Sequence, residues 1–268
     1  MSSVERNGVT VAGPADGRPM LFAHGYGCDQ NMWRFVAPAF ADVHRTVLFD
    51  HAGYGRSDPR AYSVEHYSSL SAYAEDVLDI VHDLDLRDVT FVGHSVSAMI
   101  GVLAALREPD RFAHLILVGP SPRYIDEPAD GYVGGFTRAE IDELLEAVDS
   151  NYLGWSRTMA PVIMGNSDRP ELAEELTNSF CRTDPVVARQ FAQLTFTSDN
   201  REDLAKVTVP TLILQCSDDV IAPMAVGEYV HRRIPGSELV VLTATGHCPN
   251  LSAPAATVAA IKAFLRVP

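Results

Sequence analysis

Short runs of hydrophobic residues alternate along the chain with longer segments of helical periodicity. Six such runs predict strands, over Met20–Ala23, Thr46–Phe49, Val89–Val92, Leu115–Val118, Thr211–Leu214 and Leu239–Leu242. Most of them are hydrophobic at nearly every position, which is typical of strands that are covered on both faces. The alternation of these strands with helical segments predicts an α/β fold with a mostly parallel central sheet flanked by helices.

Two segments of the predicted α/β fold have clear helical signals. Between the second and third strands, hydrophobic residues recur at the spacing of one helix face, at Ala74, Val77, Leu78, Val81 and Leu84. Such a stripe predicts an amphipathic helix that packs on the sheet. The last helix is predicted over Ala255–Leu265.

The regular alternation stops between residues 121 and 200, where no good strand candidate occurs and several helix starts do. Thr137 and Glu140 have the spacing of a capping box. Asp184–Pro185 places a capping residue before a proline at the first helical position. A further helix is predicted over Glu171–Phe180, so this region is predicted to be all-helical.

We therefore expect a core formed by residues 1–120 and 201–268, with residues 121–200 inserted as a helical lid. The insertion contains eight aromatic residues, namely Tyr124, Tyr132, Phe136, Tyr152, Trp155, Phe180, Phe191 and Phe196. They could form the core of the insertion itself. As a set they are also sufficient to line an apolar pocket beneath a lid, where small-molecule sites commonly form.

Composition excludes several classes of partner. Of the 268 residues, 47% are hydrophobic and 21% are charged, as in ordinary folded proteins. Lys and Arg total 21 and Asp and Glu total 35, and the resulting net charge of −14 argues against nucleic acid and anionic membranes as partners. There is no apolar stretch of about 18 residues and no secretory signal pattern at the N-terminus. The cysteines are scattered without a C-x-x-C pair, which fits reduced thiols and a cytoplasmic protein.

No cofactor or metal is expected. The two lysines, Lys206 and Lys262, do not follow a glycine-rich loop, so a G-x-x-x-x-G-K-[ST] nucleotide site is missing. The glycine-rich segment Asp50–Ser57 lacks the G-x-G-x-x-G order of dinucleotide sites and is interpreted as a structural turn. No pair of His, Asp or Glu residues has a recognised metal-ligand spacing.

Ser95 is the candidate nucleophile, because it lies between a predicted strand that ends at Val92 and a predicted helix that begins near Val96. Such a turn places the serine hydroxyl above the carboxyl edge of the sheet, at the positive end of the next helix. The segment Gly93–Ser97 departs from the usual G-x-S-x-G pattern, since Ser97 replaces the second glycine. Serine is small, so we expect the turn to form with altered packing or hydrogen bonding near Ser95.

A serine hydroxyl needs a base, and this turn predicts a carboxylate and then a histidine further along the chain. Asp218 and Asp219 follow the fifth predicted strand, and His247 follows the sixth. We choose Asp219 as the residue that orients His247, because it lies four residues before Pro223, the usual spacing in this loop. Asp218 is interpreted as a solvated turn residue. Among the other histidines, structural roles are expected for His94, directed away from Ser95, and for His51, in a loop.

Acyl transfer also requires backbone N–H donors for the oxyanion. The loop after the first predicted strand contains Gly25, Tyr26 and Gly27, and it matches the position of an oxyanion loop. We assign the two donors to the backbone amides of Tyr26 and Val96, with the Tyr26 ring in the pocket wall. The alternative is that this loop merely makes a turn.

These residues together resemble the α/β-hydrolase family. Within it, the chain is most similar to the RsbQ-like subgroup of bacterial stress-response regulators, which resembles the plant strigolactone and karrikin receptors. The likeness covers nearly the whole chain and rests on His24–Gln30 with Trp33, Gly93–Val96, Phe180–Pro185, Ala188–Phe191, Arg201–Leu204, Leu212–Cys216 and Gly246–Pro249.

The resemblance implies a hydrolase core with a V-shaped lid of four helices over an apolar pocket. It places a catalytic triad on Ser95, Asp219 and His247, and pocket aromatics on Tyr26, Phe136, Trp155, Phe191 and Phe196. It also implies slow hydrolysis of small esters or lactones and, in RsbQ-like members, activation of a sensor-type phosphatase. Tyr26 departs from the phenylalanine frequent in this group, and its hydroxyl puts the identity of the ligand in question.

We therefore expect a serine hydrolase that cleaves a small, largely apolar ester or lactone. The rival expectation is a ligand-sensing protein that activates a partner phosphatase and hydrolyses slowly or incidentally. A lyase or haloperoxidase without cofactor is a third reading. Haloalkane dehalogenation is set aside, because that reaction uses a carboxylate nucleophile and the turn carries Ser95.

Overall fold

Seven strands form one sheet in the order β1-β3-β2-β4-β5-β6-β7. The computed structural model describes residues 1–267. The strands are β1 (Thr10–Ala12), β2 (Arg18–Ala23), β3 (His44–Leu48), β4 (Val89–His94), β5 (Phe112–Val118), β6 (Thr211–Asp218) and β7 (Glu238–Thr245). All neighbouring pairs are parallel except β1 and β3, which are antiparallel. The predicted α/β class and mostly parallel sheet are confirmed.

The six predicted strands are present, and β1 is the strand that the sequence pattern did not indicate. All three residues of β1 are exposed, so the strand carries no hydrophobic run or alternation. It pairs at the edge of the sheet, where Val11 lies opposite Val47. The central strand β4 is buried at every position, which agrees with its continuous hydrophobic sequence.

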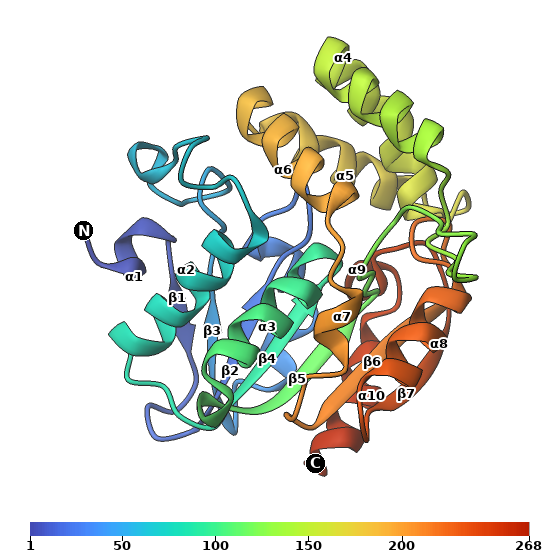
Figure 1. The fold of residues 1–268 in the computed structure, drawn as a ribbon. Helices are drawn as coiled ribbons and strands as arrows, with labels where there is room; N and C mark the ends of the chain where they lie inside the picture. Colours follow the sequence, from blue (N-terminus) through green and yellow to red (C-terminus); the bar gives the residue numbers. More distant parts are fainter. Residues whose placement is uncertain (268) are drawn as a thin grey trace.

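Helices flank the sheet and cover the carboxyl ends of its strands (Figure 1). Their bounds are α1 (Ser3–Arg6), α2 (Leu70–Asp83), α3 (Val96–Arg107), α4 (Arg138–Met164), α5 (Pro170–Arg182), α6 (Pro185–Thr197), α7 (Arg201–Leu204), α8 (Met224–Arg233), α9 (Pro249–Ser252) and α10 (Pro254–Leu265). Helices α4, α5 and α6 lie between β5 and β6 in the chain and above the sheet in Figure 1. We call residues 121–200 the lid segment. Its division from a core of residues 1–120 and 201–268 stays a prediction.

The lid segment contains four helical stretches, because α4 is interrupted. Asn151 has a non-helical backbone (φ −154°, ψ 74°). Its side-chain oxygen accepts the N–H of Gly154 at 3.0 Å, which caps the second half of the helix. The predicted caps are also confirmed: Thr137 and Glu140 form a capping box, and Asp184 caps α6.

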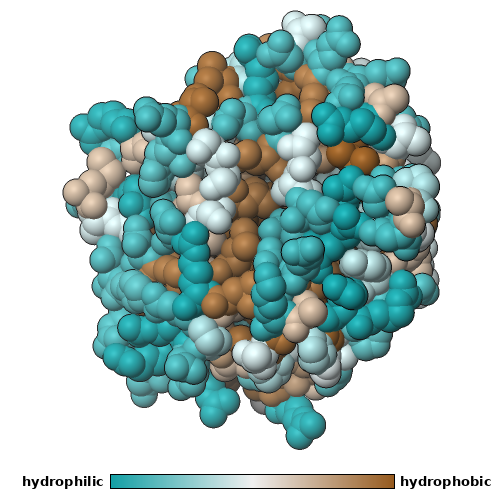
Figure 2. All heavy atoms as spheres, in the orientation of Figure 1, coloured by the Kyte–Doolittle hydropathy of each residue, from teal (hydrophilic) through white to brown (hydrophobic). Residues whose placement is uncertain are grey.

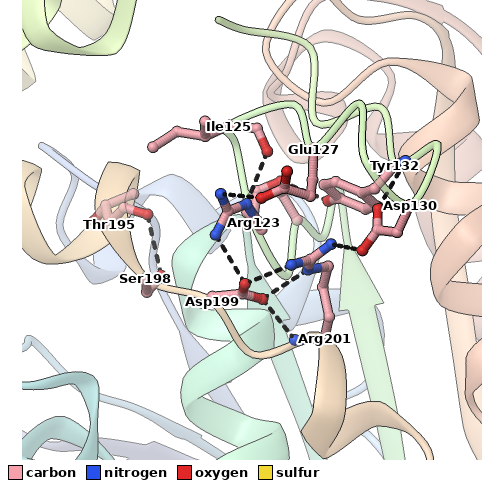
Figure 3. A network of polar contacts seen from close by, with 10 residues as sticks. Arg123, Ile125, Glu127, Asp130, Tyr132, Thr195, Ser198, Asp199 and Arg201 are labelled. Atoms are coloured by element: carbon pink, nitrogen blue, oxygen red, sulfur yellow. Dashed lines mark hydrogen bonds and ion pairs between the residues drawn. The ribbon is translucent and has the colours of Figure 1, made fainter. Parts of the chain in front are cut away.

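Ion pairs connect the two ends of the lid segment (Figure 3). Arg123, which follows β5, and Arg201, which begins α7, both bind Asp199 with N–O distances of 2.8 Å. Arg201 also pairs with Asp130 at 2.9 Å, and its guanidinium carbon lies 4.8 Å from the ring centroid of Tyr132. A shared network holds long side chains better than isolated surface pairs do. The network therefore fixes the point at which the chain enters and leaves the lid segment.

The face shown in Figure 2 is hydrophilic over most of its area, with hydrophobic residues visible in its middle, around α3. On α3, the hydrophobic residues Leu103 and Leu106 are only partly buried, whereas nine other residues of this helix are buried. Within residues 1–267, no helix combines the length and the apolar character that a membrane span requires.

Candidate active site

The turn between β4 and α3 presents Ser95 in a backbone conformation that residues other than glycine rarely adopt. Ser95 has φ 56° and ψ −123°, which costs on the order of 1–3 kcal/mol and is found mainly at functional sites. Its N–H donates to the Val118 carbonyl at 2.8 Å and thereby fixes the turn to β5. Gly93 allows the close approach of strand and helix, because a Cβ there would lie 2.7 Å from the carbonyl carbon of Ser97.

The structure brings Ser95, His247 and Asp219 into contact, although they lie on three separate loops. His247 Nε2 lies 2.8 Å from Ser95 Oγ, and His247 Nδ1 lies 2.7 Å from Asp219 Oδ2. A carboxylate only accepts, so Nδ1–H donates to Asp219, and Nε2 accepts from the Ser95 hydroxyl. All three residues are buried. The hydroxyl is thus hydrogen-bonded to a base whose tautomer is fixed.

The second oxygen of Asp219 is held by its own loop. Oδ1 accepts the backbone N–H of Ile221 at 2.8 Å and that of Ala222 at 3.0 Å. Burial raises the pKa of Asp219, but His247 and these two N–H groups outweigh burial, so the pKa lies below its ordinary value. Asp218 is exposed on β6, and only its backbone carbonyl takes part here, accepting Gly246 N–H at 2.7 Å.

His94 binds the main chain of the loop that carries His247. Its Nε2 lies 2.7 Å from the His247 carbonyl oxygen, and because a carbonyl can only accept, Nε2 carries the proton. Complete burial, with a smaller effect of His247, lowers the pKa of His94 to about 3. His94 is therefore neutral, and its contact is with the main chain of residue 247. This position agrees with the structural role that we expect for it.

Ser97, which replaces the second glycine of the motif, connects the nucleophile turn to the loop after β2. Its hydroxyl donates to the His24 carbonyl oxygen at 2.5 Å and lies 2.7 Å from His51 Nε2. Since the Ser97 proton goes to His24, His51 Nε2–H donates to Ser97. Burial keeps the pKa of His51 well below its usual value, so this ring is neutral. The extra hydroxyl thus adds two hydrogen bonds behind Ser95, and His51, in the loop after β3, provides one of them.

The loop that carries Tyr26 lies directly against the nucleophile turn. A Cβ on Gly25 would lie 3.3 Å from the Cβ of Ser95 and would also strike the His94 ring, so only glycine fits there. Tyr26 follows in this loop, and Val96 is the first residue of α3. The N–H at the first position of a helix has no acceptor within its own helix. The two amides predicted to bind an oxyanion therefore lie on segments that meet at Ser95.

Tyr124 is a neighbour of Ser95 that the sequence reasoning did not single out. Its hydroxyl lies 3.3 Å from Ser95 Oγ, and burial raises the pKa of Tyr124 to about 12. The phenol is therefore protonated at neutral pH. Because Ser95 donates to His247, Tyr124 is the donor in this contact. Its only advance signal was its place among the aromatic residues of the lid segment.

A small apolar cavity lies between this site and the lid segment. Its volume is about 30 Å³, enough for roughly two water molecules. Its wall contains Tyr26, Cys28, His94, Ser95, Tyr124, Trp155, Ile163, Leu176, Phe180, Thr195, Phe196, Ile221, His247 and Cys248. A substrate larger than a few atoms therefore enters only when side chains or lid helices move.

Three of the five predicted pocket aromatics, Tyr26, Trp155 and Phe196, line the cavity, and two do not. Phe136 is held at the base of the lid segment, where its N–H donates to the Tyr124 carbonyl at 3.2 Å. Phe191 lies outside the cavity wall, where it packs on Tyr73 with a centroid distance of 4.6 Å and on Tyr26 with one of 6.2 Å. The two corrections have different causes. Phe136 pairs with Ile125 before α4 begins, whereas Phe191 lies on α6, which carries aromatics on several faces, and the sequence does not say which face meets Ser95.

Phe180 and Thr195 line the cavity without having been assigned to the pocket. The Phe180 ring stacks on Trp155 with a centroid distance of 5.7 Å and an interplanar angle of 11°. Helical spacing could have suggested Phe180, which lies one turn beyond Leu176 on α5 and shares its buried face. Thr195 carries no such hydrophobic signal.

Among residues 1–267, no group of three or more His, Cys, Asp or Glu side chains is placed to hold a metal ion. All four cysteines are free thiols. Burial raises the pKa of Cys28 and of Cys216 to about 12, so neither thiol is a nucleophile at neutral pH.

A serine, a histidine and a carboxylate at the carboxyl ends of parallel strands, under helices inserted in the chain, define a hydrolase. Residues 20–261 match the model of the alpha/beta hydrolase family. The chain belongs to this family.

Relatives named as receptors and relatives named as esterases or hydrolases both agree with this family assignment. A karrikin insensitive 2 receptor of Petunia hybrida is 38% identical over 251 residues, which cover 93% of this chain and 90% of that protein. A strigolactone esterase of Arabidopsis thaliana is 37% identical over 253 residues, covering 94% and 93%. The solved structure of a hydrolase from Oleispira antarctica is 41% identical, with a TM-score of 0.95 over 98% of this chain and 96% of that one.

Proposed function

We propose that this protein is a serine hydrolase that cleaves a small, largely apolar and uncharged ester or lactone. The observation that carries the proposal is the continuous chain of contacts from Ser95 through His247 to Asp219, at 2.8 and 2.7 Å. The wall of the cavity adjoining it is aromatic and aliphatic apart from a few hydroxyls, thiols and histidines. Apolar substrates gain free energy from such burial, whereas a charged substrate would lose its hydration.

In the first half of the proposed reaction, Ser95 Oγ attacks the carbonyl carbon while its proton passes to His247 Nε2. The carbonyl oxygen becomes an oxyanion, and the amides of Tyr26 and Val96 donate to it. The tetrahedral intermediate then collapses, and the departing alkoxide takes the proton from His247. Asp219 stays ionised throughout and stabilises the imidazolium.

In the second half, His247 removes a proton from water, and the resulting hydroxide attacks the acyl-enzyme. Collapse of the second intermediate releases the carboxylic acid, and the proton returns to Ser95 Oγ. A lactone differs only in that its leaving alcohol stays attached to the acyl group. Tyr124 donates a hydrogen bond to Ser95 Oγ in the resting state and would keep it oriented between the two steps.

Relatives named as receptors support a second candidate function. Since the chain is 38% identical to a karrikin insensitive 2 receptor, the same site could serve to sense a ligand, with hydrolysis slow or incidental. In this reading the chain is RsbQ-like, and its lid segment activates a sensor-type phosphatase in a stress response. The net charge of −14 disfavours nucleic acid and anionic membranes as partners in either case.

Turnover by the purified protein of a panel of short esters and lactones distinguishes the candidates. We expect repeated hydrolysis of uncharged substrates, and much slower reaction of counterparts that carry a free carboxylate. A single turnover followed by retention of the product, together with capture of a purified sensor phosphatase, would favour the receptor. If the folded protein hydrolyses no member of the panel and binds none, the proposed function is wrong.

A further inference from the structure

Thr195 differs from the other serines and threonines of α4, α5 and α6, because each of their hydroxyls donates to a backbone carbonyl. Ser156, Thr158, Thr177 and Thr197 each donate to the carbonyl four residues earlier in their own helix, at distances from 2.6 to 3.2 Å. Thr195 lies on α6, two residues before Thr197, and its hydroxyl makes no such bond. Among the described residues, its Oγ1 is buried without any hydrogen-bond partner.

The position of Thr195 is that of a ligand contact. The residue is 2% exposed and lines the cavity that also contains Ser95 and His247. A buried hydroxyl without a partner costs on the order of 1–3 kcal/mol. A bound molecule with an oxygen at this point would remove that cost, and a purely hydrocarbon molecule would not.

Tyr26 provides a second hydroxyl of the same kind. It is 8% exposed, lines the same cavity, and within residues 1–267 its hydroxyl also has no partner of good hydrogen-bond geometry. The nearby Tyr152 hydroxyl donates its own proton to the Phe180 carbonyl at 2.9 Å, so towards Tyr26 it can act only as an acceptor, which a bound oxygen would replace. Tyr26 belongs to the core loop and Thr195 to a lid helix, so two hydroxyl-bearing side chains from different parts of the chain line the same small cavity.

The cavity offers no charge for such an oxygen. No lysine or arginine occurs among its lining residues in the described part of the chain, and His94 is neutral because burial lowers its pKa to about 3. A carboxylate or phosphate would lose its hydration without gaining a cation. The matching group is therefore neutral: a ketone, an ether or a hydroxyl.

We propose that Thr195 and Tyr26 form a polar subsite that selects esters or lactones with a second, uncharged oxygen away from the scissile carbonyl. This proposal rests on the proposed hydrolase function and narrows its substrate class. Thr195 acts on specificity and takes no part in the proton transfers at Ser95.

The test compares three esters of matched size: pentyl pentanoate, pentyl 4-oxopentanoate and 3-methoxypropyl pentanoate. The second carries an added oxygen on the acyl side, and the third carries one on the alcohol side. For each oxygenated ester, kcat/KM is divided by that of pentyl pentanoate. We expect this ratio, for at least one of the two, to be about fivefold higher in the wild type than in Thr195→Val, as the loss of one neutral hydrogen bond implies.

Matched variants separate the hydroxyl from packing. Thr195→Ser keeps the hydroxyl and is expected to keep the wild-type ratio. Tyr26→Phe is expected to lower this ratio, as Thr195→Val does. Thr197→Val removes the neighbouring hydroxyl, which is already bonded to the Gln193 carbonyl, and should leave the ratio unchanged. Equal ratios in the wild type and Thr195→Val for both esters would overturn the subsite.

A binding measurement keeps this result separate from the hydrolase proposal. The N-methyl amides of pentanoic and 4-oxopentanoic acid, and N-(3-methoxypropyl)pentanamide, resist hydrolysis, and their Kd values can be followed through the fluorescence of Trp155 in the cavity wall. An oxygen-dependent affinity that Thr195→Val removes supports the subsite even if no ester is turned over, in which case only the hydrolase proposal fails. If the esters are turned over but Thr195→Val changes neither the kcat/KM ratio nor the Kd values, only the subsite proposal is wrong.

Discussion

Ser95→Ala is expected to lower kcat for a small ester by at least roughly 10⁴-fold, because within residues 1–267 the Ser95 hydroxyl is the nucleophile hydrogen-bonded to His247 Nε2. The Oγ atom lies 2.8 Å from His247 Nε2 and is the hydroxyl that the turn after β4 holds above the sheet. The residual rate would come from the oxyanion donors and from substrate binding. Initial rates with 4-nitrophenyl acetate, at equal concentrations of folded protein, measure the loss.

Ser237→Ala is the matched control for that experiment. Ser237 is also a buried serine, but it lies just before β7, at the opposite end of that strand from His247, and donates to the Ile234 carbonyl at 3.0 Å. Its replacement should leave kcat within about twofold of wild type even if it lowers stability by about 1 kcal/mol. Wild-type turnover by Ser95→Ala would show that another group carries the reaction.

Asp219→Asn is expected to lower kcat by roughly 10⁴-fold with little change in the fold. An asparagine at this position would still accept the N–H groups of Ile221 and Ala222. Its NH₂ group can however turn toward His247 Nδ1, which would then lose its proton and leave the proton on Nε2. The ring could no longer accept from Ser95. Steady-state kinetics, with circular dichroism to confirm folding, measure this effect.

Asp218→Asn makes the same chemical change one residue earlier. The Asp218 side chain is exposed, and only its backbone carbonyl contacts the His247 loop, so we expect kcat to stay near the wild-type value. Equal losses in the two variants would mean that general negative charge, rather than the contact with His247, matters. A large loss in Asp218→Asn alone would transfer the role to that residue.

The contacts of Ser95, His247 and Asp219 follow from sequence signals that depend only on local order. Each of these residues follows a hydrophobic strand, and carboxyl ends of parallel strands meet at one edge of a sheet. Predicting the strands was therefore enough to bring the three side chains to one place. The choice between Asp218 and Asp219 needed only the distance to Pro223 in the chain.

The pocket could not be predicted to the same detail, because it depends on how helices pack above the sheet. Phe136 and Phe191 have the same residue type as Phe180 and Phe196, yet only the latter pair lines the cavity. Phe191 and Phe196 share α6, and a rotation of that helix by a fraction of a turn would exchange them, whereas Phe136 precedes α4. Thr195 escaped attention for a related reason: what distinguishes it is a hydrogen bond that it does not make, and that is visible only in coordinates.

Ser97 gives an intermediate case. Its departure from the glycine of the motif was plain in the sequence, and its small size correctly indicated that the turn would form. The partners of its hydroxyl, His24 and His51, belong to loops after β2 and β3. Only the tertiary structure brings them behind the nucleophile.

The central claim is that His247 activates the hydroxyl of Ser95. Reaction of the purified protein with a phosphonylating ester, followed by intact-mass analysis and peptide mapping, tests it most directly. We expect a single adduct on Ser95 in the wild type and almost none in His247→Ala, since without the imidazole the hydroxyl has no base. An adduct on another residue, or equal labelling of Ser95 in the two proteins, would contradict the mechanism.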